Sequence, residues 1–284
     1  MPLLDHLVPI NNICQQKCNF CSAEYRMQWN PEIPLKKIFQ DILSKGDYIQ
    51  ISWWEPLLHP KVFEILYFIK KYKPDCFIEF QSNGILMLKN KNIEKLLKCW
   101  VNLFNINYPC HISVINDQIA WVPWTLPIRE KAMKKIIELG GKLRINIIVN
   151  TVNLSYIPQM IQYISETFHW FERIQLSFTK AMWAADRNKQ VVPQYEEAEP
   201  YFIEALKIGK KLGIKIDVDH IPMCFLWPYF LNHVDYHKME KQEEGVYMIE
   251  KNYVEKCNSC TLKSKCTGYR KDYLGIYDIK QNYV

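Results

Sequence analysis

Short runs of β-branched and aromatic residues alternate with longer segments of helical period through the first two thirds of the chain. The short runs predict buried strands, and the longer segments predict amphipathic helices. The predicted strands are Leu7–Ile13, Tyr48–Trp53, Phe77–Gln81, Val101–Tyr108, Leu143–Asn150 and Arg173–Phe178. The predicted helices are about Leu35–Ser44, Pro60–Tyr72, Asn92–Cys99, Ile128–Leu139 and Ser155–Phe168. Repeated strand–helix units predict an α/β fold built around a parallel sheet.

Turn and cap residues support these boundaries. Pro60 suits the first turn of a helix, and Gly46 and the Gly140–Gly141 pair stand where helices should end. The hydrophobic periodicity alone allows an open doubly wound sheet as readily as a barrel, because both folds repeat the same right-handed strand–helix–strand unit. A cysteine-rich loop directly follows the first predicted strand, and βα barrels place their chemistry in the loops after the strands. The sequence therefore favours a barrel.

The segment after the sixth predicted strand is less regular. Residues Thr179 to Pro200 are weakly periodic, so they either line a substrate entrance or simply connect two elements. A helical pattern returns from Tyr201 to Leu212, and the strand-like run Ile214–Val218 follows it. We expect the barrel to end near residue 215.

Composition allows one large domain with a small appendage, since the 284 residues are 49% hydrophobic. The chain carries 36 basic and 30 acidic side chains, a net charge of +6. Its lysines are scattered and no arginine-rich run occurs, so nucleic-acid binding is not expected. The longest apolar stretch, Ile221–Leu231, contains two prolines and is far shorter than the roughly 20 residues that span a bilayer. No membrane span is expected.

Three cysteines, Cys14, Cys18 and Cys21, lie within eight residues near the start. Soft thiolates around one small centre suit an iron–sulfur cluster. Three sulfurs cannot fill the four iron positions of a [4Fe–4S] cluster, and an open iron suggests catalysis. Zinc is the alternative, although it usually takes two C-x-x-C pairs or added histidines. Ten cysteines without an apolar signal core at the start favour a reducing cytoplasm over a disulfide framework.

The C-x-x-x-C-x-x-C spacing, with the aromatic Phe20 just before the third cysteine, resembles the cluster loop of radical S-adenosylmethionine (radical SAM) enzymes. The resemblance implies a partial (β/α)6 barrel and one [4Fe–4S] cluster that binds S-adenosylmethionine (SAM). It also implies that reductive cleavage of SAM gives a 5′-deoxyadenosyl radical, which takes hydrogen from a substrate. A reducing electron donor such as flavodoxin or ferredoxin is the implied partner.

A segment after the second predicted strand carries the resemblance further. Trp53-Trp54-Glu55-Pro56 resembles the family's G-G-E-P segment, with tryptophan in place of both glycines. The resemblance assigns the amino group of SAM to the Glu55 carboxylate and to the backbone carbonyl of Trp54. Bulky residues there restrict positive φ and close approach of the backbone. The two tryptophans either wall the substrate cavity or pack at the strand end.

Three further SAM-binding candidates lie within predicted strands or just after them. The run Ser82-Asn83-Gly84 resembles the family's T-N-G turn, which lies near the ribose and carboxylate of SAM, and makes Ser82 and Asn83 candidates. Asn-Gly is also an ordinary turn dipeptide. In the fifth predicted strand, Arg144 is a second candidate for the SAM carboxylate.

A second group of cysteines lies in the last third of the chain: Cys224, Cys257, Cys260 and Cys266. The C-x-x-C-x5-C spacing resembles the auxiliary-cluster segment of SPASM and twitch extensions, shortened because no cysteine follows Cys266. The resemblance implies one auxiliary [4Fe–4S] cluster, and therefore two clusters in all. A structural zinc site is the alternative. Cys224 is either the fourth ligand or, as in some radical SAM epimerases, a catalytic thiol that returns hydrogen to a carbon radical.

The resemblance therefore predicts a cytoplasmic radical SAM enzyme, with the barrel over residues 1–215 and a SPASM/twitch-like extension over residues 216–284. The shortened extension favours a ribosomally made peptide as substrate, modified by cross-linking or epimerisation. Because the first cluster cysteine is residue 14, we expect the peptide to bind directly or through a separate recognition protein. A dehydrogenase or epimerase of a sugar or aminocyclitol is the second hypothesis. A zinc-binding scaffold is the non-enzyme hypothesis.

Overall fold

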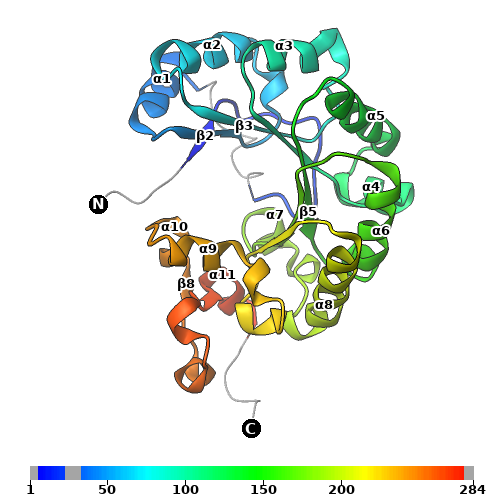
Figure 1. Ribbon diagram of the computed structural model, residues 1–284, viewed down its shortest axis with the longest axis vertical. Helices are drawn as coiled ribbons and strands as arrows, with labels where there is room; N and C mark the ends of the chain where they lie inside the picture. Colours follow the sequence, from blue (N-terminus) through cyan, green and yellow to red (C-terminus); the bar gives the residue numbers. More distant parts are fainter. Residues whose placement is uncertain (1–5, 23–32, 278–284) are drawn as a thin grey trace.

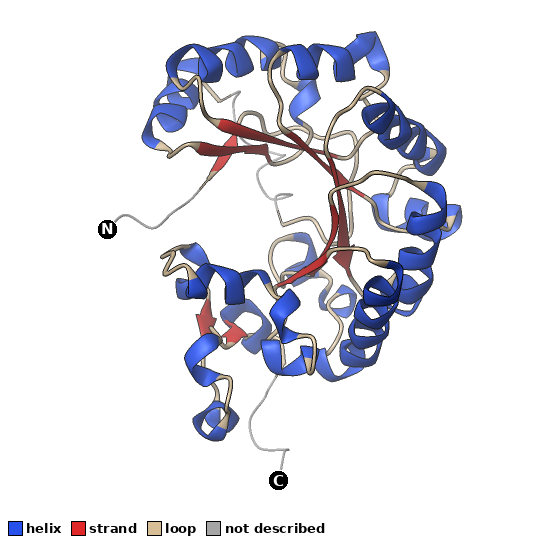
Figure 2. Ribbon diagram, in the orientation of Figure 1, coloured by secondary structure: helices blue, strands red, loops and turns tan. Residues whose placement is uncertain are grey.

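The computed structural model describes residues 6–22 and 33–277. Its centre is a sheet of seven parallel strands that follow one another in chain order (Figures 1 and 2). The strands are β1 (Leu7–Pro9), β2 (Tyr48–Ser52), β3 (Phe77–Ser82), β4 (Leu103–Asn107), β5 (Leu143–Val149), β6 (Arg173–Phe178) and β7 (Ile216–Asp219). Strands β1 and β7 are the two edges of this sheet in the described residues, so the barrel is partial.

Helices α1 to α6 and α8 cover the outer, convex side of the curved sheet (Figures 1 and 2). The helices are α1 (Leu35–Ser44), α2 (Val62–Tyr72), α3 (Asn92–Lys98), α4 (Ser113–Ala120), α5 (Thr125–Glu138), α6 (Ile157–Thr167), α7 (Ala184–Arg187), α8 (Tyr195–Leu212), α9 (Val234–Glu240), α10 (Val246–Ile249) and α11 (Lys271–Leu274). None of the helices in the described residues is both long and apolar enough to cross a membrane.

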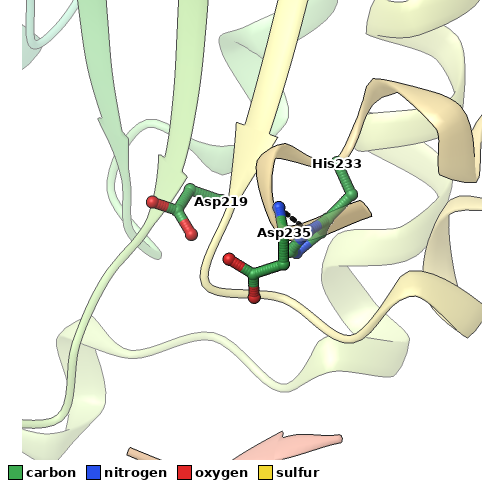
Figure 3. Close-up of side chains that lie close together, drawn as sticks. All are labelled: Asp219, His233 and Asp235. Carbon is green, nitrogen blue, oxygen red and sulfur yellow. Dashed lines mark hydrogen bonds between the residues drawn. The ribbon is translucent and has the colours of Figure 1, made fainter. Parts of the chain in front are cut away.

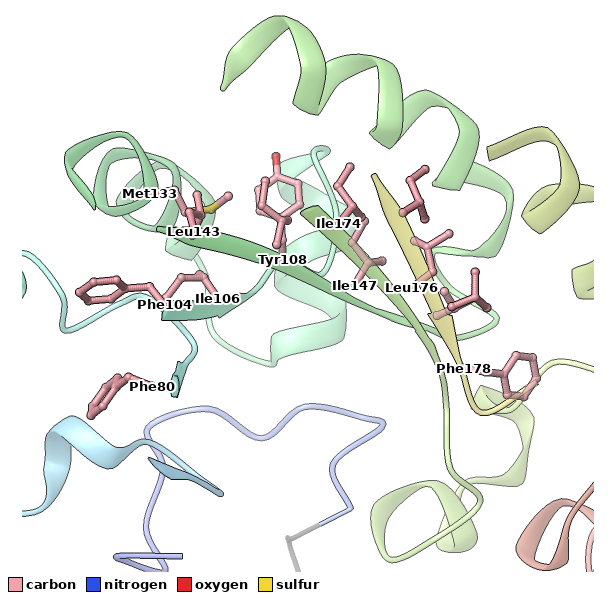
Figure 4. Close-up of a cluster of buried hydrophobic side chains, with 14 of the residues drawn as sticks. Phe80, Phe104, Ile106, Tyr108, Met133, Leu143, Ile147, Ile174, Leu176 and Phe178 are labelled. Carbon is pink, nitrogen blue, oxygen red and sulfur yellow. The ribbon is translucent and has the colours of Figure 1, made fainter. Parts of the chain in front are cut away.

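Strand β5 shows how the sequence forms the two faces of the sheet. Its residues alternate between buried and half-buried positions, and the buried ones are Leu143, Ile145, Ile147 and Val149. Side chains that alternate along a strand point to opposite faces. Figure 4 shows Leu143 and Ile147 within the buried apolar cluster on the helix side of the sheet. The polar residue Arg144 therefore lies on the inner, concave face.

The predicted α/β partial barrel is confirmed, and the sheet is one strand longer than the six strands expected. The strand-like run Ile214–Val218 becomes β7, which pairs with β6. Helix α4 was not predicted, because its central Asn116-Asp117-Gln118 run interrupts the apolar period. Helix α8 begins at Tyr195, earlier than predicted, since Gln194 and Glu197 form a reciprocal capping box.

The C-terminal segment packs beside the end of the barrel nearest β7 (Figure 1). It contains the short antiparallel pair β8 (Lys251–Asn252) and β9 (Tyr269–Arg270). The ring of Tyr273 stacks on that of Tyr195 with centroids 3.6 Å apart, and the Tyr195 amide donates to the Tyr273 hydroxyl. These contacts join the segment to helix α8. The division between two domains near residue 215 stays a prediction.

Candidate functional site

The cysteine loop directly follows strand β1. All three thiols, of Cys14, Cys18 and Cys21, are half-buried, and the Cys21 amide donates to the Cys18 carbonyl. Two amides of the loop, from Lys17 and Asn19, donate to carbonyls at the C-terminal end of helix α4. Phe20 is half-buried between the second and third cysteines. Helix α4, which the sequence did not predict, therefore anchors the loop.

Polar groups surround the first thiol of the loop. The Gln16 amide lies 3.4 Å from the Cys14 sulfur, and the side-chain amide of Asn83 lies 3.6 Å from it. Burial raises the pKa of Cys14 to about 12 and also raises the pKa of Cys18. A buried thiol ionises only beside a compensating positive charge, which a metal supplies. The loop thus has the donor set and surroundings of a metal-thiolate site.

Glu55 lies in the turn after strand β2 and is fully buried. The Ser82 hydroxyl donates to its carboxylate at 2.9 and 3.0 Å, and the Asn83 amide donates to it at 3.0 Å. The Leu57 amide is a third donor, at 3.2 Å. Burial raises the pKa of Glu55 to about 7 against the opposing effect of these hydrogen bonds. The structure therefore brings Glu55, Ser82 and Asn83 together.

The turn that carries Glu55 is also tied to the cysteine loop. The Glu55 amide donates to the carbonyl of Ile13, the residue before Cys14, at 3.1 Å. The side-chain amide of Asn11 donates to the Glu55 carbonyl at 2.6 Å. The Asn83 turn is linked to the same loop by the Gln15 side chain, which donates to the Asn83 side chain at 3.1 Å. Loops from three neighbouring strands thus form one site at the carboxyl edge of the sheet.

Trp53 and Trp54 precede Glu55 with φ angles of 70° and 53°. Their rings meet edge to face with centroids 5.5 Å apart. The indole nitrogen of Trp54 is buried and has no hydrogen-bond partner. A positive φ is a strained conformation for a bulky residue. Both tryptophans therefore occupy backbone positions that suit glycine.

Arg129 of helix α5 is a site residue that sequence analysis missed. Its side chain is fully buried and its Nε donates to the Asn83 carbonyl at 2.9 Å. One terminal nitrogen donates to the Asn116 side chain, and the other is buried without a partner. Burial lowers the pKa of Arg129 to about 10. In the sequence it lies in a helix of mixed charge, where nothing distinguishes it from a solvated arginine.

Arg144 lies apart from this group of residues. Its guanidinium lies 3.1 Å from the Glu79 carboxylate of strand β3 and 3.4 Å from the Gln175 side-chain oxygen of strand β6. Asn105, on the strand between, also donates to Glu79. The ion pair crosses the inner face of the sheet. A role of Arg144 toward SAM stays a prediction, as does the role of Phe20.

The four C-terminal cysteines line one small cavity. Cys224, Cys257, Cys260 and Cys266 share its wall with Tyr253, Leu262, Gly268 and Tyr269. Gly268, at φ 87°, approaches strand β8 so closely that a Cβ would lie 2.4 Å from the Asn252 carbonyl oxygen. The same turn directs the Gly268 amide toward the Cys266 sulfur at 3.4 Å. The predicted association of Cys224 with the distant cysteines is therefore seen in the structure.

A separate group of potential metal ligands lies beside strand β7 (Figure 3). Its three ligand atoms, from Asp219, His233 and Asp235, lie within 4.8 Å of one another. His233 is engaged at both ring nitrogens: Nδ1 accepts from the Asp235 amide, and Nε2 contacts the Ile221 carbonyl. The Asp235 carboxylate binds the ammonium group of Lys251. No ring nitrogen of His233 is left for a metal. This group joins strand β7 to the C-terminal segment as a buried polar network.

The Radical SAM superfamily model matches residues 8–170. The matched region contains the first cysteine loop, Glu55 and the Ser82–Asn83 turn, and it covers more than half of the chain. The chain belongs to the radical SAM superfamily. Membership implies an enzyme with a [4Fe–4S] cluster and SAM as cofactors. A comparison with curated protein sequences finds no match.

Solved structures resemble the whole fold at low sequence identity. The structure titled "Native anSMEcpe with bound AdoMet and Cp18Cys peptide" has 12% identity and a TM-score of 0.63, with 95% of this chain and 90% of that chain covered. Streptococcus suis SuiB bound to precursor peptide SuiA has 15% identity and a TM-score of 0.62, with 76% and 48% covered. HydG, a maturase of the [FeFe]-hydrogenase, has 10% identity and a TM-score of 0.57, with 75% and 50% covered.

The chain thus spans about half the length of SuiB and HydG. Identities this low show the fold alone. Because peptide-bound enzymes and a hydrogenase maturase share this fold, the fold does not select a substrate class.

Proposed function

We propose that this radical SAM enzyme binds its SAM-cleaving cluster through Cys14, Cys18 and Cys21 and acts on a ribosomally made peptide. The observation that carries the proposal is the convergence of three loops, in which Asn83 contacts both the Cys14 sulfur and the Glu55 carboxylate. When bound, the cluster and SAM supply a 5′-deoxyadenosyl radical that abstracts hydrogen. The soft, half-buried thiols fit the cluster, since thiolates are its usual ligands.

The residues around the thiols position the cofactor. Glu55 offers a carboxylate to the amino group of SAM, and Ser82 and Asn83 fix the orientation of that carboxylate. The carbonyl of Trp54 is the backbone acceptor next to it. Arg129 stabilises the Asn83 turn by donating to its carbonyl, and it places a buried positive charge near the thiolates. We assign these residues to orientation and charge balance.

Glu55→Gln should weaken SAM binding by about tenfold or more, because it replaces an ion pair to the ammonium with a neutral contact. The pKa of Glu55 near 7 also predicts a pH effect. Lowering the pH from about 8 to about 6 should protonate the carboxylate and weaken binding progressively in the native enzyme. Equilibrium dialysis of SAM against the anaerobic, cluster-loaded protein measures both effects.

The matched control is Glu64→Gln on the surface of helix α2, which should leave affinity and its pH dependence unchanged. An unaltered SAM affinity in Glu55→Gln would remove Glu55 from the site.

Arg129→Met should raise the SAM dissociation constant by about tenfold, because the Asn83 carbonyl loses its donor and the turn loosens. Thermal stability should change less, since the lost hydrogen bonds are offset by removal of a buried, incompletely paired charge. The measurements are SAM dialysis and a thermal melt of the same preparation. Lys131→Met, on the exposed side of the same helix, is the control. A large loss of stability with unchanged SAM affinity would assign Arg129 to folding alone.

We also propose an auxiliary [4Fe–4S] cluster in the C-terminal segment. The four cysteines that line one cavity support it. Cys224 lies in the wall of this cavity, which supports a role as fourth ligand over that of a hydrogen donor in the barrel. Burial raises the pKa of Cys224 to about 11, so ligation requires positive charge from the cluster.

The substrate class is tested with the anaerobic enzyme, SAM, dithionite and short peptides encoded beside its gene. A peptide product that has lost two hydrogens indicates cross-linking, and one that has gained solvent deuterium indicates epimerisation. Turnover of a sugar or aminocyclitol, with all these peptides unmodified, would replace the peptide proposal with the small-molecule one. Formation of 5′-deoxyadenosine in either case leaves the radical SAM assignment intact.

A further inference from the structure

The tryptophans of this chain share an unusual backbone conformation. Eight of the nine lie in the described residues, and seven of these have a φ between 53° and 70°. They are Trp53, Trp54, Trp100, Trp121, Trp124, Trp170 and Trp183. The left-handed region costs energy for every residue with a Cβ, and glycine is the residue that adopts it freely. Seven positions that suit glycine are thus occupied by the largest side chain.

The ends of three helices provide an internal comparison. At the end of helix α5, the Gly140 amide donates to the carbonyl three residues back, and the next amide donates five residues back. Gly213 at the end of helix α8 shows the same two bonds. Trp100 at the end of helix α3 also shows both, at φ 59° against 77° and 69° for the two glycines. This is the Schellman motif, in which glycine is the usual residue.

The side chains give no reason for tryptophan at the surface positions. The exposed fraction is 55% for Trp100, 70% for Trp121, 76% for Trp124 and 91% for Trp170. A role in docking a partner would explain the indole side chains, but it would not require a positive φ at these residues. What these residues share is the backbone conformation.

The amino-acid composition also indicates that glycine is missing from this chain. The chain has nine glycines in 284 residues, where average usage of about 7% would give about twenty. It has as many tryptophans as glycines. Counting the tryptophans as glycines would bring the glycine content close to the average.

We propose that the functional protein carries glycine at these seven positions, because the codon translated here as tryptophan is decoded as glycine in the native organism. A codon has the same meaning at every position that it encodes. The proposal therefore also covers Trp29 and Trp227 where the same codon encodes them. At Trp53 and Trp54 it removes two indoles beside Glu55, including the buried Trp54 nitrogen that lacks a partner. The segment before Pro56 then becomes Gly-Gly-Glu. Any effect of this Gly-Gly-Glu segment on SAM binding rests on the proposed function. The assignment of glycine to the seven positions does not depend on that function.

The direct test is peptide mass spectrometry on the protein purified from its native organism. The proposal predicts that peptides spanning the seven positions have the mass of the glycine form. Peptides with the mass of the tryptophan form would overturn it. This result is independent of whether the protein cleaves SAM.

A second test uses the protein with tryptophan at these positions. It measures whether glycine at one of them raises the melting temperature. Trp170→Gly should raise the melting temperature by roughly 2–4 °C, because glycine relieves the left-handed strain at an exposed site. Trp170→Ala should raise it much less, since alanine keeps a Cβ. Trp227→Gly is the matched control: its φ is −63°, its ring stacks on Phe230, and no gain is expected. Equal effects of glycine and alanine at position 170 would contradict the proposal.

Discussion

Cys18→Ala is expected to abolish formation of 5′-deoxyadenosine, with a loss of at least about 10³-fold, or about 4 kcal/mol of barrier. The reason is geometric, because the loop offers only three thiols and each must bind a separate iron. With two sulfurs left, the cluster is not held in contact with the SAM site. The measurement is chromatographic detection of 5′-deoxyadenosine after anaerobic reduction with dithionite in the presence of SAM.

The control for this variant is Cys99→Ala. Cys99 follows helix α3, has no metal-binding spacing and lies outside both cysteine groups. It should keep its iron and its activity. If Cys18→Ala retained 5′-deoxyadenosine formation, the assignment of the first cysteine loop would be wrong.

Cys266→Ala should reduce the iron content from about eight to about four per chain, while 5′-deoxyadenosine formation persists. Cys266 is buried in the wall of the C-terminal cavity, and its sulfur accepts from the Gly268 amide. The first cysteine loop is bound by other elements, so its cluster should survive. Iron analysis of anaerobically purified protein provides the measurement. Ser259→Ala, beside Cys260 in the same segment, should keep all eight irons.

Cys224→Ala separates the two roles considered for that thiol. A ligand role predicts loss of the auxiliary iron, as in Cys266→Ala. A hydrogen-donor role predicts full iron content with loss of the final hydrogen return alone. Zinc in place of the auxiliary iron in the native protein would contradict the cluster proposal for this segment.

The strands and most helices were predictable from sequence because their apolar residues follow a strict period. Strand β5 illustrates this, with buried Leu143, Ile145 and Ile147 facing the helices. Helix α4 was not predictable, since its stability depends on burial of Asn116 against Arg129 and Thr125. A polar residue buried through long-range contacts carries no periodic signal.

The grouping of candidate site residues was predictable where a short motif carries its own chemistry. The cysteine spacing and the Glu55 and Asn83 segments are of this kind. The supporting contacts were not predictable, because Arg129 reaches Asn83 across 46 residues of sequence. The left-handed conformation of Trp100 and Trp170 likewise became evident only from backbone angles.

The central claim is that the loop of Cys14, Cys18 and Cys21 supports reductive cleavage of SAM beside Glu55. Its most direct test is the incubation of protein from the native organism, purified without oxygen and reduced with dithionite, with SAM alone. The account predicts that 5′-deoxyadenosine and methionine appear in equal amounts and that neither forms with Cys18→Ala. Protein that holds its iron and binds SAM, yet releases no 5′-deoxyadenosine with or without candidate substrates, would contradict it.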